Sequence, residues 1–417
     1  MKKFMKFNTK PLSSFGKTQH PAKHLAAALL VTATLTFTGA VTTSSFARAE
    51  NTQANDDGAY LDAPYFRGFP STFKKIELAK DPAGDSVPMV SPIRAVIAKQ
   101  SKVRSQANRG TCSIFASTAL FESMLAIQYP QQFSVQSLDL SEEWLEYLVV
   151  RTKQEDGASS YENFQMISKY GMPTEPTFPY IGETWKTVES SPLAKLRCGS
   201  ITEATTQTSC LLAHRNPSLL FATNAQLSEA GTPLFDKEFA KARSEARALK
   251  SKFLTQMNPG PVTLHSETLI KKTLAAGTPI TLDLDFYYGA WNHRRGTEFG
   301  LVRKMDEWSK GIVTYPEPGS LDLEKSREED FSAGHSIVLV GYDDQLAIDT
   351  KIQMSDGTFK TITLKGFYFF KNSWGTENFG VKFTLNGEVI PGYGMISQKY
   401  AHEYGSFHKM VLVKPEE

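Results

Sequence analysis

Cys112 is the strongest candidate for a reactive residue in this sequence. It directly follows a polar stretch, residues 106–111, and an apolar run begins after it. We expect a helix that begins near Thr111 and ends before Pro130. Cys112 would then lie in the first turn, where unpaired backbone N–H groups and the helix dipole stabilise a thiolate. A thiolate is the nucleophilic form, although a cysteine taken alone is as often small, buried and inert.

Two distant segments supply the partners that such a nucleophile needs. Residues 333–342 read Ala-Gly-His-Ser-Ile-Val-Leu-Val-Gly-Tyr, and residues 367–375 read Phe-Tyr-Phe-Phe-Lys-Asn-Ser-Trp-Gly. With Gln106 six positions before Cys112, these stretches resemble the papain-like cysteine peptidases. That family has a glutamine at this spacing, a histidine opening a strand that ends in Gly-Tyr, and an Asn-Ser-Trp-Gly closing another strand. Each element alone is a weak signal, but the three in family order are specific.

The resemblance implies a catalytic set of Cys112, His335 and Asn372. His335 would take the thiol proton and later protonate the leaving amine, while Asn372 would hold the imidazole in orientation. The Gln106 side-chain amide and the backbone N–H of Cys112 would form the oxyanion hole, where losing one donor costs about 3 kcal/mol of barrier. Trp374 would cover the histidine–asparagine contact and keep water out.

Gly157-Ala158 stands where the family has a pair of glycines that line the substrate cleft. In the family the bare backbone of this pair hydrogen-bonds to an extended peptide, in the manner of an added strand. The methyl group of Ala158 would narrow the cleft here. An ordinary turn is the alternative explanation for Gly157.

Three departures from the family pattern mark this chain as a divergent member, which we expect to be bacterial and secreted. Ser113 stands where many members have a tryptophan, and Arg109 stands where a disulfide-forming cysteine is usual. Far more residues separate Cys112 from His335 than the roughly 130–150 typical of the family. An insertion between the two halves accounts for much of this excess.

The resemblance implies an α+β, two-lobed fold with the active site in the cleft between a helical lobe and an antiparallel, β-barrel-like lobe. We expect the helical lobe with the nucleophile over residues 86–189. Residues 190–262 would form the insertion, with a long amphipathic helix. Residues 263–417 would form the β-rich lobe that carries the histidine and the asparagine, with an added hairpin over residues 343–365.

The insertion has a clear helical pattern. Thr232-Pro233 predicts its start through a cap and a first-turn proline. Apolar side chains then recur at three- and four-residue steps: Phe235, Phe239, Ala242, Ala246, Leu249 and Phe253. Basic side chains, Arg243 among them, are expected on the outer face. Such a stripe favours packing on the catalytic domain, and the alternatives are a partner-binding helix or a lid over the cleft.

Residues 1–49 are typical of an export signal. Lysines precede an apolar stretch at residues 25–41, no acidic residue occurs, and Ala47-Arg48-Ala49 fits a small-x-small cleavage site. A retained membrane anchor is the alternative, but a run this rich in threonine spans poorly. We therefore expect a periplasmic or extracellular protein without stable membrane insertion. Residues 50–85 would be a linker or a short pro-segment.

The three cysteines agree with export. If Cys112 stays free, Cys198 and Cys210 can pair across a short polar loop. A disulfide is plausible in an oxidising compartment, and two unrelated thiols are the alternative.

Composition limits the remaining functions. The 417 residues are enough for two or three domains, and 41% hydrophobic with 22% charged residues exclude a disordered chain or a membrane bundle. A net charge of +2 predicts no nucleic-acid partner, and no spacing suggests a metal site or a cofactor.

The expected protein is a monomeric cysteine peptidase that acts on peptides or proteins. A papain-fold acyltransferase or non-peptide amide hydrolase is one alternative, because a thiolate and an oxyanion hole would serve those reactions equally. An inactive homologue that only binds peptides is the other alternative.

Overall fold

The structure is a computed structural model that describes most of the chain after residue 85. The described residues are 78, 86–151, 153, 155–254, 261–328 and 333–412. The chain divides into two compact units, Met1–Ala47 and Arg48–Glu417, and every described residue belongs to the second. The predicted export signal and, apart from Leu78, the predicted linker therefore lie outside the described residues. Among the helices that are described, none is long and apolar enough to cross a membrane.

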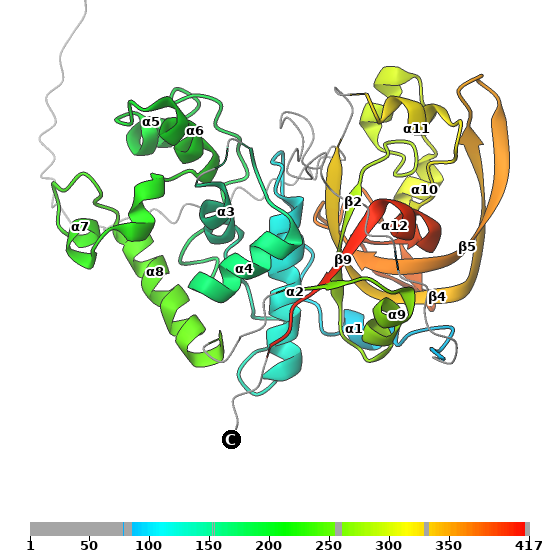
Figure 1. Ribbon diagram of the computed structural model, residues 1–417, viewed down its shortest axis with the longest axis horizontal. Coiled ribbons are helices and arrows are strands. Elements are labelled where there is room, and N and C mark those ends of the chain that lie inside the picture. Colours follow the sequence, from blue (N-terminus) through cyan, green and yellow to red (C-terminus); the bar gives the residue numbers. More distant parts are fainter. Residues whose placement is uncertain are drawn as a thin grey trace, which may run out of the picture. The chain divides into compact units, whose positions relative to one another are not determined.

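The first part of the described chain is helical and forms the lobe at the left of Figure 1. Its elements are α1 (Ile93–Ile97), α2 (Cys112–Gln128), α3 (Glu142–Val150), α4 (Ser160–Tyr170), α5 (Pro192–Cys198), α6 (Ala204–Ala213), η2 (Pro217–Phe221), α7 (Asn224–Ser228), α8 (Lys237–Leu249) and the π-helical turn η3 (Lys250–Leu254). We call α2 to η3 the helical lobe; α1 instead packs near β4.

Helix α2 is the central element of the fold. It begins at Cys112 and ends at Gln128, as the apolar run and the following proline predict. The helix is enclosed on nearly all sides, and every residue except Ala119, Ile127 and Gln128 is buried. The cause is that α3 and α4 pack on one side of the helix while β2 and β4 pack on another.

The helices that flank α2 begin at side-chain caps. Ser141 accepts a 3.0 Å hydrogen bond from the backbone N–H of Trp144, so α3 begins where the sequence predicts. Helix α4 opens with a capping box between Ser159 and Glu162. This cap fixes the start of α4 directly after Gly157-Ala158.

The second part of the described chain is built on a sheet and forms the β lobe at the right of Figure 1. Its strands are β1 (Val262–Leu264), β2 (Ile280–Asp285), β3 (Ile312–Val313), β4 (Gly334–Gln353), β5 (Phe359–Lys371), β6 (Thr384–Leu385), β7 (Glu388–Val389), β8 (Tyr393–Ser397) and β9 (Gly405–Lys409). Its helices are α9 (Glu267–Ala275), η4 (Arg294–Phe299), α10 (Met305–Ser309), α11 (Leu321–Lys325) and α12 (Gln398–Tyr404).

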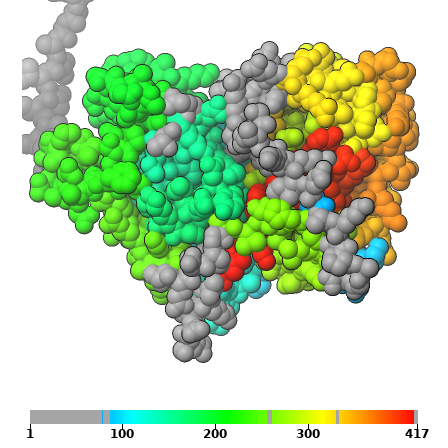
Figure 2. Space-filling view, in the orientation of Figure 1, coloured from blue at the N-terminus to red at the C-terminus, as the bar shows by residue number. Residues whose placement is uncertain are grey.

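Seven of these strands form one sheet in the order β1-β9-β2-β4-β5-β8-β3, and β6 pairs with β7 separately. All neighbours in the large sheet are antiparallel except β3 and β8. The predicted α+β architecture, with a helical lobe and a mostly antiparallel β lobe, is thus confirmed. Figure 2 shows one face of these two parts, with helical-lobe residues in teal to green and β-lobe residues in yellow-green to red.

Strands β4 and β5 form the predicted hairpin. Asp343 pairs with Phe367 at one end of the added segment and Gln353 with Phe359 at the other, with the turn at Ser355-Asp-Gly357. The same two strands continue into the core, where Val338 lies opposite Lys371. Because the strands are antiparallel, the first residues of β4 and the residue after β5 meet at the same end.

The predicted disulfide is confirmed: Cys198 and Cys210 are bonded and join α5 to α6. The structure corrects two details of the helix predicted for the insertion, which is α8. Helix α8 begins at Lys237 rather than at Thr232-Pro233, because the Asp236 carboxylate accepts the N–H of Phe239 at 2.9 Å and so provides the cap.

The other correction concerns Arg243, which is not on the outer face. It is 4% exposed and donates to the carbonyl of Ala222 and to Asn224. The apolar stripe of α8 packs on α3, where the Phe239 ring centroid lies 5.2 Å from that of Trp144 and 4.9 Å from that of Tyr147. This contact favours packing on the helical lobe over a lid.

Candidate active site

Cys112 is the first residue of α2 and is the one free cysteine of the chain. The backbone groups of Ser336, Ser113 and Cys112 itself lie close enough to the sulfur to lower the pKa of the thiol, against the larger effect of burial, which raises it. An N–H in the first helical turn has no partner within the helix, so it is free to face negative charge. The sulfur therefore lies at a helix terminus whose donors would stabilise a thiolate.

His335 follows the first residue of β4, and its ring is fixed from one side. Its Nε2 lies 2.9 Å from Oδ1 of Asn372, which directly follows β5. The same oxygen accepts the backbone N–H of Ser373 at 2.9 Å, so it is an acceptor and Nε2 must carry the proton. The other nitrogen, Nδ1, has no hydrogen-bond partner within the described part of the chain. Its lone pair is available to take a proton.

The structure brings the strand that carries this imidazole next to the sulfur. Helix α2 packs against β4, and the sulfur contacts the backbone of Ser336, the residue after His335. The hairpin geometry of β4 and β5 then places Asn372 at Nε2 of the ring. Cys112, His335 and Asn372, which are far apart in the sequence, thus form one connected group.

Aromatic rings enclose the imidazole. Trp374 stacks on His335 with a centroid distance of 4.8 Å and an interplanar angle of 30°. Trp291 and Phe286 approach edge-on, at 5.1 Å and 5.9 Å. Trp374 was expected from the sequence, whereas nothing in the spacing of the other two indicates the site. Rings on several sides keep water away from the histidine–asparagine hydrogen bond.

Gln106 is fully buried and held by the Asn-Ser-Trp-Gly segment. Ser373 Oγ donates to its Oε1 at 2.6 Å, and its own backbone N–H donates to the Ser373 carbonyl at 2.9 Å. Its Nε2 donates one hydrogen to the carbonyl of Arg109, at 2.9 Å. An amide nitrogen carries two hydrogens, so the second remains for an oxyanion. The motif that holds Asn372 therefore also orients the predicted oxyanion donor, a role of Ser373 that sequence analysis missed.

Burial favours the uncharged forms of both reacting groups. It raises the pKa of the Cys112 thiol to about 12, although the backbone of Ser336 lowers it. Burial lowers the pKa of His335 to about 3, against the effect of its bond to Asn372, and neighbouring His293 lowers it further. The resting pair is thus a thiol beside a neutral imidazole. Proton transfer between them leaves the net charge unchanged and creates two charges that attract each other.

Asp283 is a second residue near the sulfur that sequence analysis missed. This buried carboxylate of β2 accepts hydrogen bonds from Ser336 Oγ at 2.7 Å and from the backbone N–H and Oγ of Ser160 at 2.8 and 2.6 Å. It therefore joins the N-terminus of α4 to the strand that carries His335. Its negative charge also raises the pKa of the Cys112 thiol, after the larger effect of burial.

Gly157 and Ala158 lie beside the nucleophile but use their N–H groups internally. Gly157 has a φ of +75°, which favours glycine, and donates to Glu146 at 3.2 Å. Ala158 is fully buried and donates to Ser113 Oγ at 3.3 Å. The predicted pairing of this segment with a substrate strand therefore cannot use these two N–H groups without breaking internal bonds.

Removing the Gln106 amide by Gln106→Ala is expected to lower kcat by roughly 10²–10³-fold, the usual effect of losing one oxyanion donor. Steady-state kinetics of the purified variants would test this. Gln100→Ala is the matched control, because Gln100 is also buried and its amide donates to Val96 and Ser123, away from the site. An equal loss of kcat in both variants would show that the effect comes from the fold and not from an oxyanion contact.

No protein-family model and no curated protein sequence matches this chain. Solved structures do match. Xylellain, a cysteine protease from Xylella fastidiosa, is similar at 16% identity and a TM-score of 0.42, over 80% of this chain and 96% of that chain.

A structure from work on the mite allergens Blo t 1 and Der p 1 matches at 18% identity and a TM-score of 0.42, over 82% of this chain and 78% of that one. The digestive procathepsin L2 proteinase of Tenebrio molitor larval midgut matches at 15% identity and a TM-score of 0.41, over 83% and 78%. At this level of similarity, function has to be argued from the residues of the site.

Proposed function

We propose that this chain is a papain-like cysteine peptidase that hydrolyses peptide bonds. One observation carries the proposal: the His335 ring is held at Nε2 by Asn372, its Nδ1 has no partner among the described residues, and the backbone of the next residue, Ser336, lies at the sulfur of a cysteine at a helix N-terminus. A nucleophile, a base and a group that orients the base are the parts that covalent acyl transfer requires.

The reaction follows from these positions. The Cys112 thiol gives its proton to Nδ1 of His335 as sulfur attacks the substrate carbonyl carbon. The oxygen of the tetrahedral intermediate then receives hydrogen bonds from Gln106 Nε2 and the Cys112 backbone N–H. The imidazolium protonates the leaving amine, the C–N bond breaks, and a thioester remains. Water attacks the thioester while His335 takes its proton, and the thiol is released as the acid leaves.

A second candidate, transfer of the acyl group to an amine, is favoured by a separate observation. Cys112 and His335 are each 0% exposed. A site that excludes water protects a thioester from hydrolysis, so that an amine entering with the substrate could resolve it instead. The same residues would act, and only the final acceptor would differ.

Incubating the protein with a mixed peptide library, with and without an added amine such as glycinamide, separates these reactions. Mass spectrometry of the products should show new carboxyl termini carrying ¹⁸O from labelled water if the chain is a hydrolase. Amide products without ¹⁸O would instead identify an acyltransferase. Neither product from the reduced wild-type protein would contradict the proposal and favour a homologue that only binds peptides.

We also propose that the protein is exported to the periplasm or the medium. The disulfide between Cys198 and Cys210 supports this, because such bonds persist in oxidising compartments and are rare in the cytosol. The amino-terminal sequence of the protein recovered from the medium or the periplasm would test the cleavage after Ala49, and an intact Met1 would contradict it.

A further inference from the structure

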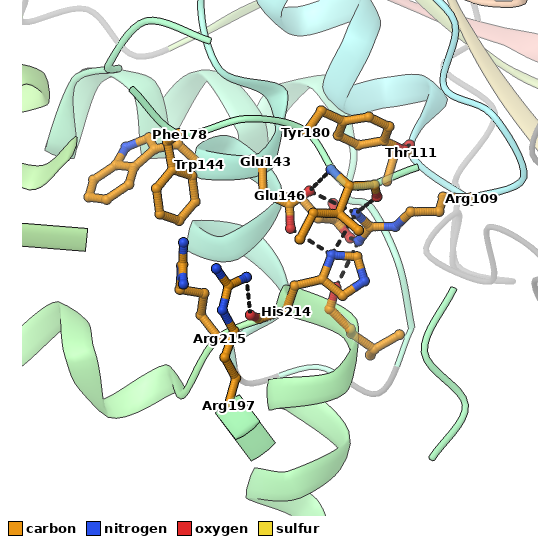
Figure 3. Close-up of polar contacts among 12 residues, drawn as sticks. Arg109, Thr111, Glu143, Trp144, Glu146, Phe178, Tyr180, Arg197, His214 and Arg215 are labelled. Atoms are coloured by element: carbon orange, nitrogen blue, oxygen red, sulfur yellow. Dashed lines mark hydrogen bonds and ion pairs between the residues drawn. The ribbon is translucent and has the colours of Figure 1, made fainter. Parts of the chain in front are cut away.

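Arg109 lies three residues before the nucleophile and is buried, with 1% of its surface exposed. Figure 3 shows its guanidinium among polar groups from several elements. Its Nη1 donates to Glu143 Oε2 at 3.0 Å and to the Ile181 carbonyl at 3.1 Å. Its Nη2 donates to Asp156 Oδ1 at 3.3 Å and to the Leu212 carbonyl at 2.7 Å. One side chain thus connects four segments of the chain.

The charges in this group fix its geometry. Burial works against the charged guanidinium, but Asp156 and Glu143 raise the pKa of Arg109, so it stays protonated. Burial also works against the Glu143 carboxylate, yet His214 and Arg109 lower the pKa of Glu143 to about 2. A buried ion pair of this kind adds little net stability over a well-packed apolar cluster, so stability alone does not account for it. Its distinctive property is directional hydrogen bonding.

Arg109 is linked to the loop before Cys112 and to the segment at Gly157. Its own carbonyl accepts Nε2 of Gln106, and this contact orients the oxyanion donor. Asp156 receives the backbone N–H of Gly110, and Glu146, 3.5 Å from the guanidinium, receives the N–H of Gly157. A shift of the guanidinium would therefore move the loop before Cys112 and the adjacent segment together.

Tyr180 contacts the same loop, residues 106–111, through its hydroxyl and its ring. Its hydroxyl donates to the Gln106 carbonyl at 2.9 Å and lies 2.7 Å from Thr111 Oγ1, while its ring centroid lies 5.3 Å from the Arg109 guanidinium carbon. Residues 106–111 are held at both ends by this arrangement. Arg109 therefore contacts Tyr180 on one side and α3 and α6 on the other.

We propose that Arg109 is a positioning residue of the active site, which keeps the Gln106 amide and the Cys112 backbone N–H aimed at the oxyanion and ties this loop to α6. This inference rests on the proposed acyl-transfer chemistry. It also gives the region of residues 190–262 a part in the site, because the Leu212 carbonyl at the end of α6 is one of the guanidinium's acceptors. The disulfide holds the same helix through Cys210.

Two reactions of Cys112 separate positioning from folding. Amide hydrolysis needs the oxyanion hole, whereas alkylation by iodoacetamide forms a C–S bond and releases iodide without an oxyanion. Arg109→Met is expected to lower kcat at least tenfold, in the range of a lost oxyanion donor, while KM and the alkylation rate of Cys112 stay within about twofold. Arg109→Lys keeps the charge but not the fork of donors, and should lie between this variant and the wild type.

Arg215→Met is the matched control. Arg215 is 5% exposed, and its guanidinium binds Asp236 and Glu238 at 3.0 and 2.7 Å. Figure 3 shows Arg215 apart from the Arg109 guanidinium. Its loss should lower the melting temperature and leave kcat per folded molecule unchanged. Parallel losses of hydrolysis and alkylation in the Arg109 variants, or unchanged kcat, would overturn the positioning role while the peptidase function stands.

The remaining outcomes are equally decisive. If Arg109→Met does not fold, Arg109→Lys supplies the comparison. Failure of both variants to fold, with Arg215→Met folded, would assign Arg109 to stability and overturn the inference. Absence of turnover in the wild-type protein would instead reject the proposed function, and the inference with it.

Discussion

Cys112→Ala is expected to abolish turnover, with kcat falling by on the order of 10⁴-fold or more, as when other enzymes lose their nucleophile. The sulfur forms the bond to the substrate, and neither His335 nor Gln106 can replace it. The fold should persist, because the change removes one buried atom from the end of α2 and no hydrogen bond that holds the helix. Circular dichroism and thermal melting would check the fold, and steady-state kinetics the loss.

Thr118→Val is the matched control for this change. Thr118 is fully buried in the same helix, and its hydroxyl has no hydrogen-bond partner among the described residues. The substitution preserves the shape of the side chain and should leave kcat within about twofold, as expected for a site without a specific partner. Turnover by Cys112→Ala at the wild-type rate would show that Cys112 is not the nucleophile and would contradict the proposed mechanism.

His335→Ala is expected to have the next largest effect, with kcat falling by about 10³-fold or more because the base and the acid are lost together. The pH dependence of thiol alkylation gives the sharper test. With a thiol pKa of about 12, only about 10⁻⁵ of Cys112 would be thiolate at pH 7 without a proton acceptor. In the proposed mechanism the wild type does not depend on this small thiolate population, because His335 would take the proton as the sulfur attacks.

The variant should therefore react slowly at pH 7 and faster as the pH rises, without a plateau below about pH 10. Asn372→Ala should reduce turnover less, because the base remains and only its orientation is lost. His402→Ala is the matched control, because the Nε2 of this histidine lies in a hydrogen bond of 2.8 Å with the Tyr368 hydroxyl on the β lobe and not with the proposed catalytic residues. Equal alkylation profiles for wild type and His335→Ala would contradict the pairing of the imidazole with the sulfur.

The parts of the site that the sequence predicts are those with local signals. The apolar run and Pro130 define α2, and hence the position of Cys112 at its first turn. His335 at the start of one strand and Asn372 after another meet because an antiparallel hairpin joins these two strands, and its turn is visible in the sequence. The disulfide follows from counting cysteines once one of them is assigned to chemistry.

What the sequence does not predict depends on contacts between distant segments. From the sequence, Arg109 is predicted to be a polar loop residue. No local sequence pattern shows that Glu143 and Leu212 will contact it. Trp291 likewise gains its place beside His335 only through the fold. The predicted start of α8 was wrong for a local reason, because Thr232 and Asp236 are both residue types that cap helices. Asp236 is the cap in the structure, and the helix that begins there packs on α3.

The Gly157-Ala158 segment shows the limit of carrying a family pattern across. The family resemblance places it in the substrate cleft, and in the structure Ala158 contacts Ser113, the residue after Cys112. Its hydrogen bonds are nevertheless turned inwards, because Glu146 and Ser113 supply acceptors at these positions. Side chains on neighbouring helices, which no local motif encodes, decide which way a backbone N–H points.

The most direct test of a nucleophilic sulfur activated by a neighbouring imidazole is covalent capture by a peptidyl epoxide. The reduced wild-type protein would be incubated with the epoxide at pH 7, digested, and mapped by mass spectrometry. We predict one adduct, on the peptide containing Cys112, that is lost in Cys112→Ala and strongly reduced in His335→Ala. Peptide cleavage that continues while Cys112 remains unmodified, or an adduct formed equally fast in His335→Ala, would contradict the account.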